Sequence, residues 1–380
     1  MLSGTLTRRL STLGAVAALA AVPMAAPADA GTGPPGWRIA ERSEEPSDIW
    51  LSKVVATGPR DAWAFGSMSS DHGPEPVARR WNGRSWTAVT LPAGLNRGIS
   101  AADASGPRNV WAIGGSEPAG GEAFALRWDG RRWHVTGRWP AHSTIADVEA
   151  LGPRDVWLFG DALIGPDSIG TWHFDGENWS QVETPIGHLQ EASGVASDDV
   201  WAIGGSPVHW QGDLLARWDG RTWNEVSVPG LPREDDHWVT FTDIHAVSSH
   251  DVWIVGREIR RSGDDHTYAP FAVHFDGSTW QRITPPSHPG VQGLQTVTSD
   301  GRGGIWVKPE RWDDEGVELL HYRDGRWTAP RLEHPEGLNA RVSDVAAVPR
   351  SRLAWAVGGL HVPESGDGYW TIWKNHAPRR

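Results

Sequence analysis

Three acidic segments that also carry tryptophan or histidine are the residues of this sequence best suited to hold a ligand. They are residues 234–238 (Glu-Asp-Asp-His-Trp), 264–266 (Asp-Asp-His) and 312–315 (Trp-Asp-Asp-Glu). An indole ring can stack on the apolar face of a sugar, and carboxylates accept hydrogen bonds from sugar hydroxyls. The same oxygens could ligate Ca²⁺, which takes about six to eight of them, although no calcium-loop spacing is present. The alternative is that these acidic runs are simply solvated.

Motifs for catalysis are nearly absent. The chain has no Cys, so a copper oxidase with a Tyr–Cys cofactor is excluded. It has no G-x-S-x-G elbow, H-E-x-x-H motif or glycine-rich phosphate loop. A sialidase-like hydrolase would need a tyrosine nucleophile, and only Tyr268 and Tyr369 fall on predicted loops. Paired carboxylates keep glycoside hydrolysis as an alternative function. We expect no cofactor, with Ca²⁺ as the one metal to test.

Charge and tryptophan content narrow the class of protein. The formal net charge is −12, which argues against nucleic acid or an anionic membrane as partner. The 25 Trp are the outlying number in the composition, so their placement decides the fold.

Residues 1–30 are typical of a signal peptide. Arg8 and Arg9 precede an apolar stretch from Leu13 to Ala26, and Ala28-Asp29-Ala30 supplies small residues for cleavage. The apolar stretch is too short to span a bilayer. We therefore expect export through this signal, by the general or the twin-arginine route, to the cell envelope or the medium, without membrane insertion.

The rest of the chain is a repeat. A motif of the form D-V-W-A-apolar-G recurs at intervals of 44 to 53 residues, at Trp63, Trp111, Trp157, Trp201, Trp253, Trp306 and Trp355. After each of the first six, an aromatic residue is followed five positions later by Trp, with Asn-Gly or Asp-Gly between them. Such a pair predicts a tight hairpin turn with positive φ at both residues.

Each repeat predicts four short antiparallel strands, here named a to d, which is the pattern of a β-propeller blade. The seventh repeat lacks strand d, while Gly36-Trp37-Arg38-Ile39 near the N-terminus resembles the opening of one. We therefore expect an all-β fold: residues 31–380 form a single seven-bladed β-propeller, its last blade closed by the N-terminal strand. Eighteen of the Trp repeat with the blades and are expected to pack between them.

The blades resemble kelch repeats. The segments Trp111–Gly115, Trp201–Gly205 and Trp355–Gly359 are similar to the double glycine that ends the second kelch strand. Single glycines at Gly66, Gly160 and Gly256 depart from that pattern. The turn tail at Ser278-Thr279-Trp280 also resembles, more weakly, the Asp-box of sialidases. Neither resemblance implies one activity, since propellers serve as lectins, hydrolases and scaffolds.

The strands that must position any site leave two unlike faces. The a–b and c–d turns are short and repeated, whereas the b–c and d–a loops, such as Ser67–Pro76, Arg257–Pro270 and Lys308–Gly316, differ from blade to blade. Diversified loops on a repeated scaffold are typical of a binding face. The strand a residues Lys53, Asp147, Asp243, Gln295 and Asp344 are expected to line the central channel and to bond neighbouring blades.

We therefore expect a secreted, monomeric, non-catalytic module that binds a polysaccharide or an extracellular protein on the b–c/d–a face. A glycoside hydrolase and a protein-interaction scaffold are the alternatives. The candidate ligand-binding residues are Trp139, Trp210, Trp238, Trp312, Asp235, Asp236, His237, Asp265, His266 and Asp313.

Overall fold

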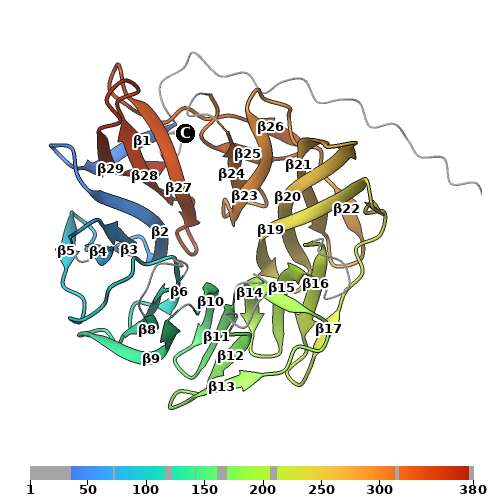
Figure 1. The fold of residues 1–380 in the computed structure, drawn as a ribbon, viewed down its shortest axis with the longest axis horizontal. Helices are drawn as coiled ribbons and strands as arrows, with labels where there is room; N and C mark the ends of the chain where they lie inside the picture. The colour runs from blue at the N-terminus through green and yellow to red at the C-terminus, as the bar shows by residue number, and fades with distance from the viewer. Residues whose placement is uncertain are drawn as a thin grey trace, which may run out of the picture.

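Seven β-sheets surround a central channel in the computed structural model of the protein (Figure 1). The structure describes residues 36–71, 73–115, 122–141, 143–160, 169–205, 212–312 and 316–375. The predicted signal peptide, residues 1–30, lies outside the described residues. The all-β, seven-bladed prediction is confirmed, and no helix occurs in the described ranges.

Blades 1 to 4 each contain four antiparallel strands in chain order, with strand a at the channel. Their strands are β2 (Ile49–Gly58), β3 (Asp61–Met68), β4 (Glu75–Trp81) and β5 (Trp86–Val89); β6 (Ala101–Gly106), β7 (Asn109–Gly114), β8 (Glu122–Trp128) and β9 (Trp133–Ala141); β10 (Ile145–Gly152), β11 (Asp155–Gly160), β12 (Thr171–Phe174) and β13 (Trp179–Val182); and β14 (His188–Ala196), β15 (Asp199–Gly205), β16 (Leu214–Trp218) and β17 (Trp223–Glu225).

Blade 6 follows the same strand order, whereas blade 5 has an additional short strand and blade 7 takes its outer strand from the N-terminus. Their strands are β18 (Arg233–Glu234), β19 (His237–Ser248), β20 (Asp251–Ser262), β21 (Asp265–Phe275) and β22 (Trp280–Arg282); β23 (Val291–Ser299), β24 (Ile305–Arg311), β25 (Leu320–Arg323) and β26 (Arg326–Thr328); and β27 (Asn339–Ala347), β28 (Ala354–His361) and β29 (Gly368–Asn375), joined by β1 (Trp37–Arg42).

The N-terminal strand closes the ring as predicted. Blade 7 has the order β1–β29–β28–β27, with Trp37 opposite Asn375. Trp37 is fully buried, and its backbone N–H donates to the carbonyl of Arg331 at 3.3 Å. This pairing joins the two ends of the described chain and removes a free sheet edge.

Tryptophan fills every junction between blades. The strand b Trp of one blade packs against the strand c or d aromatic residues of the next, with ring centroids 4.9–6.2 Å apart. These contacts occur at all seven junctions, including Trp355 on Trp81 and Trp86, and Trp306 on Trp37 at the closure. Tilted and edge-on aromatic pairs of this kind add to the free energy of burial. The packing role predicted for these residues is confirmed.

The c–d turns are hairpins, but the predicted two-residue form is wrong except in blade 6. In the other turns the Asp or Asn begins a four-residue loop, and only its Gly has a positive φ, such as 96° at Gly130. The Asp129 carboxylate accepts hydrogen bonds from the N–H groups of Arg131 and Arg132 instead. Asp324 (φ 50°) and Gly325 (φ 75°) alone make the two-residue turn. Side-chain capping thus competes with the backbone geometry that Asp-Gly favours.

Candidate functional site

Blade 5 projects a long β-hairpin from the b–c face. Strands β20 and β21 pair without interruption from Val252 and Phe275 to Ser262 and Asp265, and β19 follows them to His237. The segment Arg257–Pro270, expected to be a loop, is therefore mostly strand, and Gly263 (φ 66°) turns its tip. We call residues 233–239 and 257–270 the crest.

An ion cluster around the buried Glu258 holds the crest together. Glu258 is 7% exposed; its Oε1 lies 2.6 Å from Nε2 of His237 and 2.8 Å from the guanidinium of Arg260, and its Oε2 pairs with Arg282. Burial would raise the pKa of Glu258, but hydrogen bonds from Arg282, His237 and Arg260 lower it to about 2. An ionised carboxylate only accepts, so His237 donates through Nε2. His237 is thus a structural part of the crest.

Aromatic side chains form a stripe along the crest. The Trp238 ring meets His266 edge-on at 6.1 Å, and His266 stacks on Tyr268 at 6.3 Å. The guanidinium of Arg257 lies 5.7 Å from the centre of the Tyr268 ring. Asp235, Asp236 and Asp265 are exposed beside this stripe. The arrangement offers flat apolar rings bordered by acceptors, which is the chemistry expected for a sugar.

Polar and aromatic side chains continue from the crest onto the same face of blade 6 and then of blade 7. Arg257 donates to Glu310 of β24 at 3.0 Å, and Trp312, two residues beyond Glu310, is 74% exposed. Beside Trp312 a pocket of about 220 Å³ opens between β24 and β27, lined in part by Lys308 and Arg341. The Arg341 guanidinium lies 5.7 Å from the ring centre of Trp50, which is 44% exposed. One face thus carries a continuous set of polar and aromatic side chains over blades 5, 6, 7 and 1.

The structure brings most of the predicted site residues together. Six of them lie on the crest: Trp238, Asp235, Asp236, His237, Asp265 and His266. Trp312 lies on the neighbouring blade. Trp210 and Asp313 lie outside the described residues.

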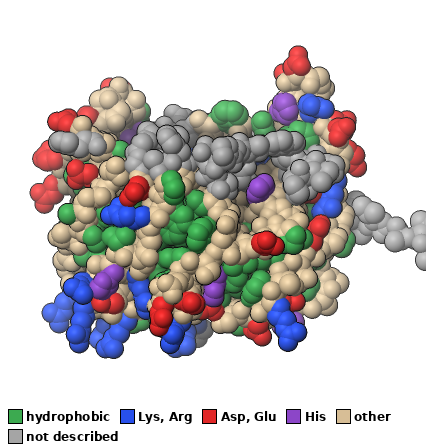
Figure 2. Space-filling model, turned by 60° about the horizontal axis from the view of Figure 1, so that its bottom comes forward, with side chains coloured by type: hydrophobic (Ala, Val, Ile, Leu, Met, Phe, Trp, Pro, Cys, Tyr) green, Lys and Arg blue, Asp and Glu red, His purple; other side chains and the backbone are tan. Residues whose placement is uncertain are grey.

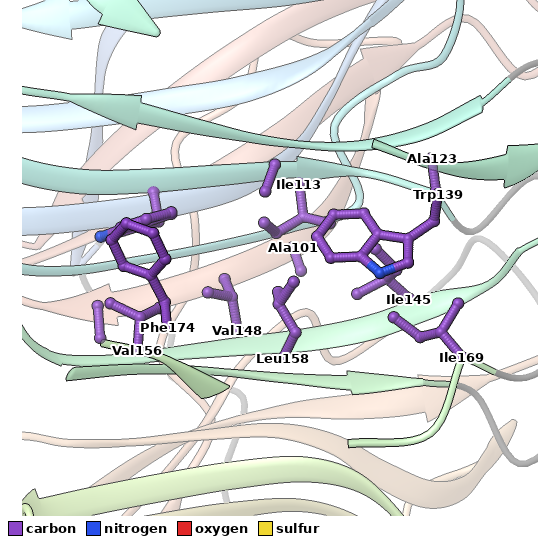
Figure 3. Packing of buried hydrophobic residues seen from close by; sticks show 13 residues of the cluster. Ala101, Ile113, Ala123, Trp139, Ile145, Val148, Val156, Leu158, Ile169 and Phe174 are labelled. Atoms are coloured by element: carbon purple, nitrogen blue, oxygen red, sulfur yellow. The ribbon is translucent and has the colours of Figure 1, made fainter. Parts of the chain in front are cut away.

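Trp139 does not belong to this surface. It was expected in a d–a connection, but β9 continues through it, and its side chain is 7% exposed. Its ring packs against Trp172 at 5.9 Å and Trp179 at 5.7 Å. It belongs to the core between blades 2 and 3, where Figure 3 shows it among buried side chains such as Ile145 and Ile169. Because β9, the strand d of blade 2, is nine residues long, Trp139 lies within the strand and its side chain is buried. Trp139 therefore stabilises the scaffold and is unavailable to a ligand.

Four further residues belong to this surface although they were not predicted from the sequence: Lys308, Arg341, Tyr268 and Trp50. Lys308 was expected in a loop, whereas β24 extends to Arg311. The repeat did contain a signal for Lys308, which stands two residues after Trp306. At the same position, all six of the remaining blades have a buried apolar residue: Phe65, Ile113, Phe159, Ile203, Val255 and Val357.

The central channel is a second region rich in ionisable groups. It forms a cavity of about 880 Å³ lined by the predicted residues Lys53, Asp147, Asp243, Gln295 and Asp344. Burial would lower the pKa of Lys53, but the carboxylates of Asp344, Glu191, Asp147 and Asp243 raise it above its usual value. Burial also raises the pKa of Asp147 to about 6 and of Asp243 to about 7, against the opposing charge of Lys53.

Three of the predicted channel residues, all carboxylates, bond their own blade to the next one, as expected. The backbone N–H groups of Ala192, Val297 and Val54 donate to Asp147 at 2.9 Å, Asp243 at 2.7 Å and Asp344 at 2.8 Å, respectively. Each bond crosses a blade junction, so these carboxylates have a structural role that needs no ligand.

Charge is distributed unevenly over the molecule. Lys and Arg side chains gather along one edge of the ring, while Asp and Glu occur on projections from the opposite edge (Figure 2). The a–b and c–d turns carry exposed arginines such as Arg60, Arg84 and Arg131. Within the described ranges, no three His, Asp or Glu side chains are grouped to hold a metal ion. The same ranges contain no helix long and apolar enough to cross a membrane.

Comparison with known proteins supports the fold. No protein-family model and no curated protein matches the chain. Solved structures do match: YCF48 bound to D1 peptide has a TM-score of 0.56 at 15% identity, covering 92% of this chain and 99% of that chain. YCF48 from Cyanidioschyzon merolae has a TM-score of 0.55 at 15% identity, covering 90% and 98%.

A GH74 xyloglucanase from Xanthomonas campestris matches with a TM-score of 0.55 at 18% identity, over 89% of this chain and 53% of that chain. At these identities the matches show the propeller alone. The kelch likeness therefore remains a resemblance between blade motifs, and the site itself must supply the argument for function.

Proposed function

We propose that this protein is an exported, non-catalytic binding module that holds a polysaccharide on the face formed by its b–c and d–a loops. The observation that carries the proposal is the exposure of tryptophan. Trp50 (44%) and Trp312 (74%) are the two Trp among the exposed large apolar side chains of the described ranges, and both lie on this face. Exposing a large ring forgoes burial energy, so it favours a binding role.

The chemistry of the face suits a sugar polymer. Rings at Trp238, Tyr268 and Trp312 are spread over two adjacent blades, which suits an extended ligand with repeated apolar faces. Acidic side chains beside the rings can accept hydrogen bonds from hydroxyl groups. The structural neighbours include one protein that binds a peptide and one xyloglucanase, so both a peptide and a glycan are ligands known on this architecture.

The face is less suited to hydrolysis. A glycosidase needs a carboxylic acid that still holds its proton near working pH. Glu258 is the most enclosed carboxylate of the crest, and its cationic partners keep it ionised, with a pKa of about 2. It therefore cannot donate a proton to a leaving group near neutral pH.

A binding screen against plant and bacterial wall polysaccharides tests the proposal. The variants Trp238→Ala and Trp312→Ala should lose binding by about tenfold or more, as expected when a stacked ring is removed. Val247→Ala is the matched control, because Val247 is 45% exposed at the a–b end of β19 on the opposite face. Its affinity should match that of the unmodified protein.

The other outcomes point to the alternatives. Release of sugar from a polymer, abolished by one carboxylate substitution, would make the protein a hydrolase. Affinity for a purified envelope protein, with no affinity for any glycan, would make it a protein-binding scaffold. Analysis of the N-terminus of protein recovered from the culture medium tests export and cleavage after residue 30.

A further inference from the structure

The pocket between blades 6 and 7 differs in chemistry from the acidic crest beside it. Its walls are β24, which contributes Lys308 and Arg311, and β27, which contributes Arg341. Trp312 lies at the edge of this pocket. Gln295 lines both the pocket and the central channel and lies between the two. The pocket volume of about 220 Å³ corresponds to about seven molecules of liquid water, enough for one sugar ring.

Lys308 breaks a rule that the other six blades obey. The equivalent positions hold apolar side chains that are no more than 2% exposed, including Phe65, Phe159 and Val357. The next position also differs, with Pro309 where the other blades have Gly. Lys308 is only partly buried, but its charge is still moved partly out of water, which costs stability. Such a local violation is expected where a residue serves a ligand.

Among the residues that the structure describes, no carboxylate forms an ion pair with Lys308; Asp344 and Glu310 act on its charge from a greater distance. Its one hydrogen-bond partner among the described residues is the neutral side-chain amide of Gln295. Nearby acids already have cationic partners: Glu318 contacts Arg311 at 3.2 Å, and Glu310 contacts Arg257 at 3.0 Å. Lys53, deeper in the channel, adds further positive charge near the pocket. An ammonium group here, beside an open pocket, is poised to receive an anion.

We propose that this pocket binds the carboxylate of an acidic sugar residue, so that the ligand is a uronate-containing polysaccharide. Lys308 and Arg341 would contact the carboxylate, and Trp312 would stack on the same ring or the next one. This inference rests on the proposed function, and it names the substrate class. It also explains how an acidic protein binds a polyanion: cations are concentrated in one pocket while the net charge remains −12.

A pair of ligands that differ only in charge gives the sharpest test. Oligogalacturonate and its methyl ester share a sugar backbone, but the ester is neutral. The unmodified full-length protein should bind the acid at least about tenfold more tightly, as expected for charge-assisted hydrogen bonds. Added salt should reduce this preference. Lys308→Leu should abolish it, and Lys308→Arg should retain most of it.

Matched variants separate a site effect from a change in fold or total charge. Leu restores the apolar type found in the other blades, so Lys308→Leu should unfold at the same or a higher urea concentration. Arg138→Gln removes one positive charge from β9, where Arg138 pairs with Glu122 at 3.3 Å outside the pocket. That variant should keep the preference for the acid.

The pH profile supplies a further readout. Burial lowers the pKa of Lys308 to about 8; Asp344 and Glu310 oppose this shift, while Lys53 and Arg341 add to it. Arg311 and Glu318 also line the pocket, and they pair with each other. Affinity for the acid should therefore be constant at lower pH and fall above about pH 8, whereas affinity for the ester should not.

Each remaining outcome decides between the two proposals. Equal binding of acid and ester, lost in Trp312→Ala but unchanged in Lys308→Leu, would overturn this inference and leave polysaccharide binding intact. Binding of poly-glutamate with no binding of either sugar would overturn both and indicate an acidic peptide. Binding of neither sugar nor peptide would also overturn both.

Discussion

Substitution of Trp37 by Ala tests whether the N-terminal strand closes the ring. Trp37 is fully buried, and its ring meets Trp306 edge-on at 5.1 Å across the junction between blades 6 and 7. Replacing a buried Trp with Ala typically costs about 3–5 kcal/mol. The indole N–H of Trp37 has no hydrogen-bond partner among the described residues, so its removal returns about 1 kcal/mol.

The expected net loss in the free energy of unfolding is therefore about 2–4 kcal/mol, a large share of the ~5–15 kcal/mol typical of folded proteins. Urea unfolding followed by far-UV circular dichroism measures it. Trp312→Ala is the control: the same chemical change at a side chain that is 74% exposed should cost no more than about 0.5 kcal/mol. A loss below about 1 kcal/mol for Trp37→Ala, or equal losses in the two variants, would refute the closure argument.

Three further predictions concern the channel and the crest. In the folded protein the pKa values of Asp147 and Asp243 are about 6 and about 7, above their values in the unfolded chain. The folded state therefore binds more protons than the unfolded state between about pH 4 and 7. Burial lowers the pKa of His245 to about 4, which opposes this effect only in part. Stability against urea should therefore fall as pH rises through this range, and Asp243→Asn should flatten the profile. Lys53→Met removes the cation that lowers the pKa values of Asp147, Asp243 and Asp344, so the fall should become deeper and extend to higher pH; an unchanged profile would count against the assignment of Lys53 as their counter-ion. Glu258→Gln should weaken hydrogen-exchange protection in residues 257–270 by about 1–2 kcal/mol and should leave the other blades unchanged. The expected loss is kept this small because Arg260 and Arg282 are partly exposed, so that solvent screens their charges.

The scaffold could be predicted from the sequence because its determinants repeat. Strand b Trp residues such as Trp63 and Trp355 recur at near-constant spacing, and each recurrence is independent evidence for the same contact. The closing role of Trp37 followed from counting strands. The channel position of Asp147 and Asp344 followed from their place on strand a, because side chains that occupy the same strand position in every blade face the same axis.

The site was predicted less completely because it consists of departures from the repeat. The length of the blade 5 hairpin determines whether Tyr268 joins Trp238 and His266, and a shift of one residue in register would turn it to the other side. Trp139 and Trp312 are the same residue type, yet Trp139 is buried because β9 continues through it, whereas Trp312 lies beyond the end of its strand and is exposed. Composition and spacing do not distinguish these two cases; the lengths of the strands do.

Blade 6 shows why departures from the repeat are informative in such a protein. A ring with seven tryptophan junctions distributes its stability, so one blade can tolerate a costly residue without losing the fold. Blade 6 places Lys308 where the others place Val, Ile or Phe, replaces the following Gly with Pro309, and uses a c–d turn not found in the other described blades. Drift alone would favour an apolar residue at position 308, since even a partly buried lysine loses hydration of its charge. Its position beside an open pocket and an exposed tryptophan is therefore best explained by a ligand whose charge offsets that cost.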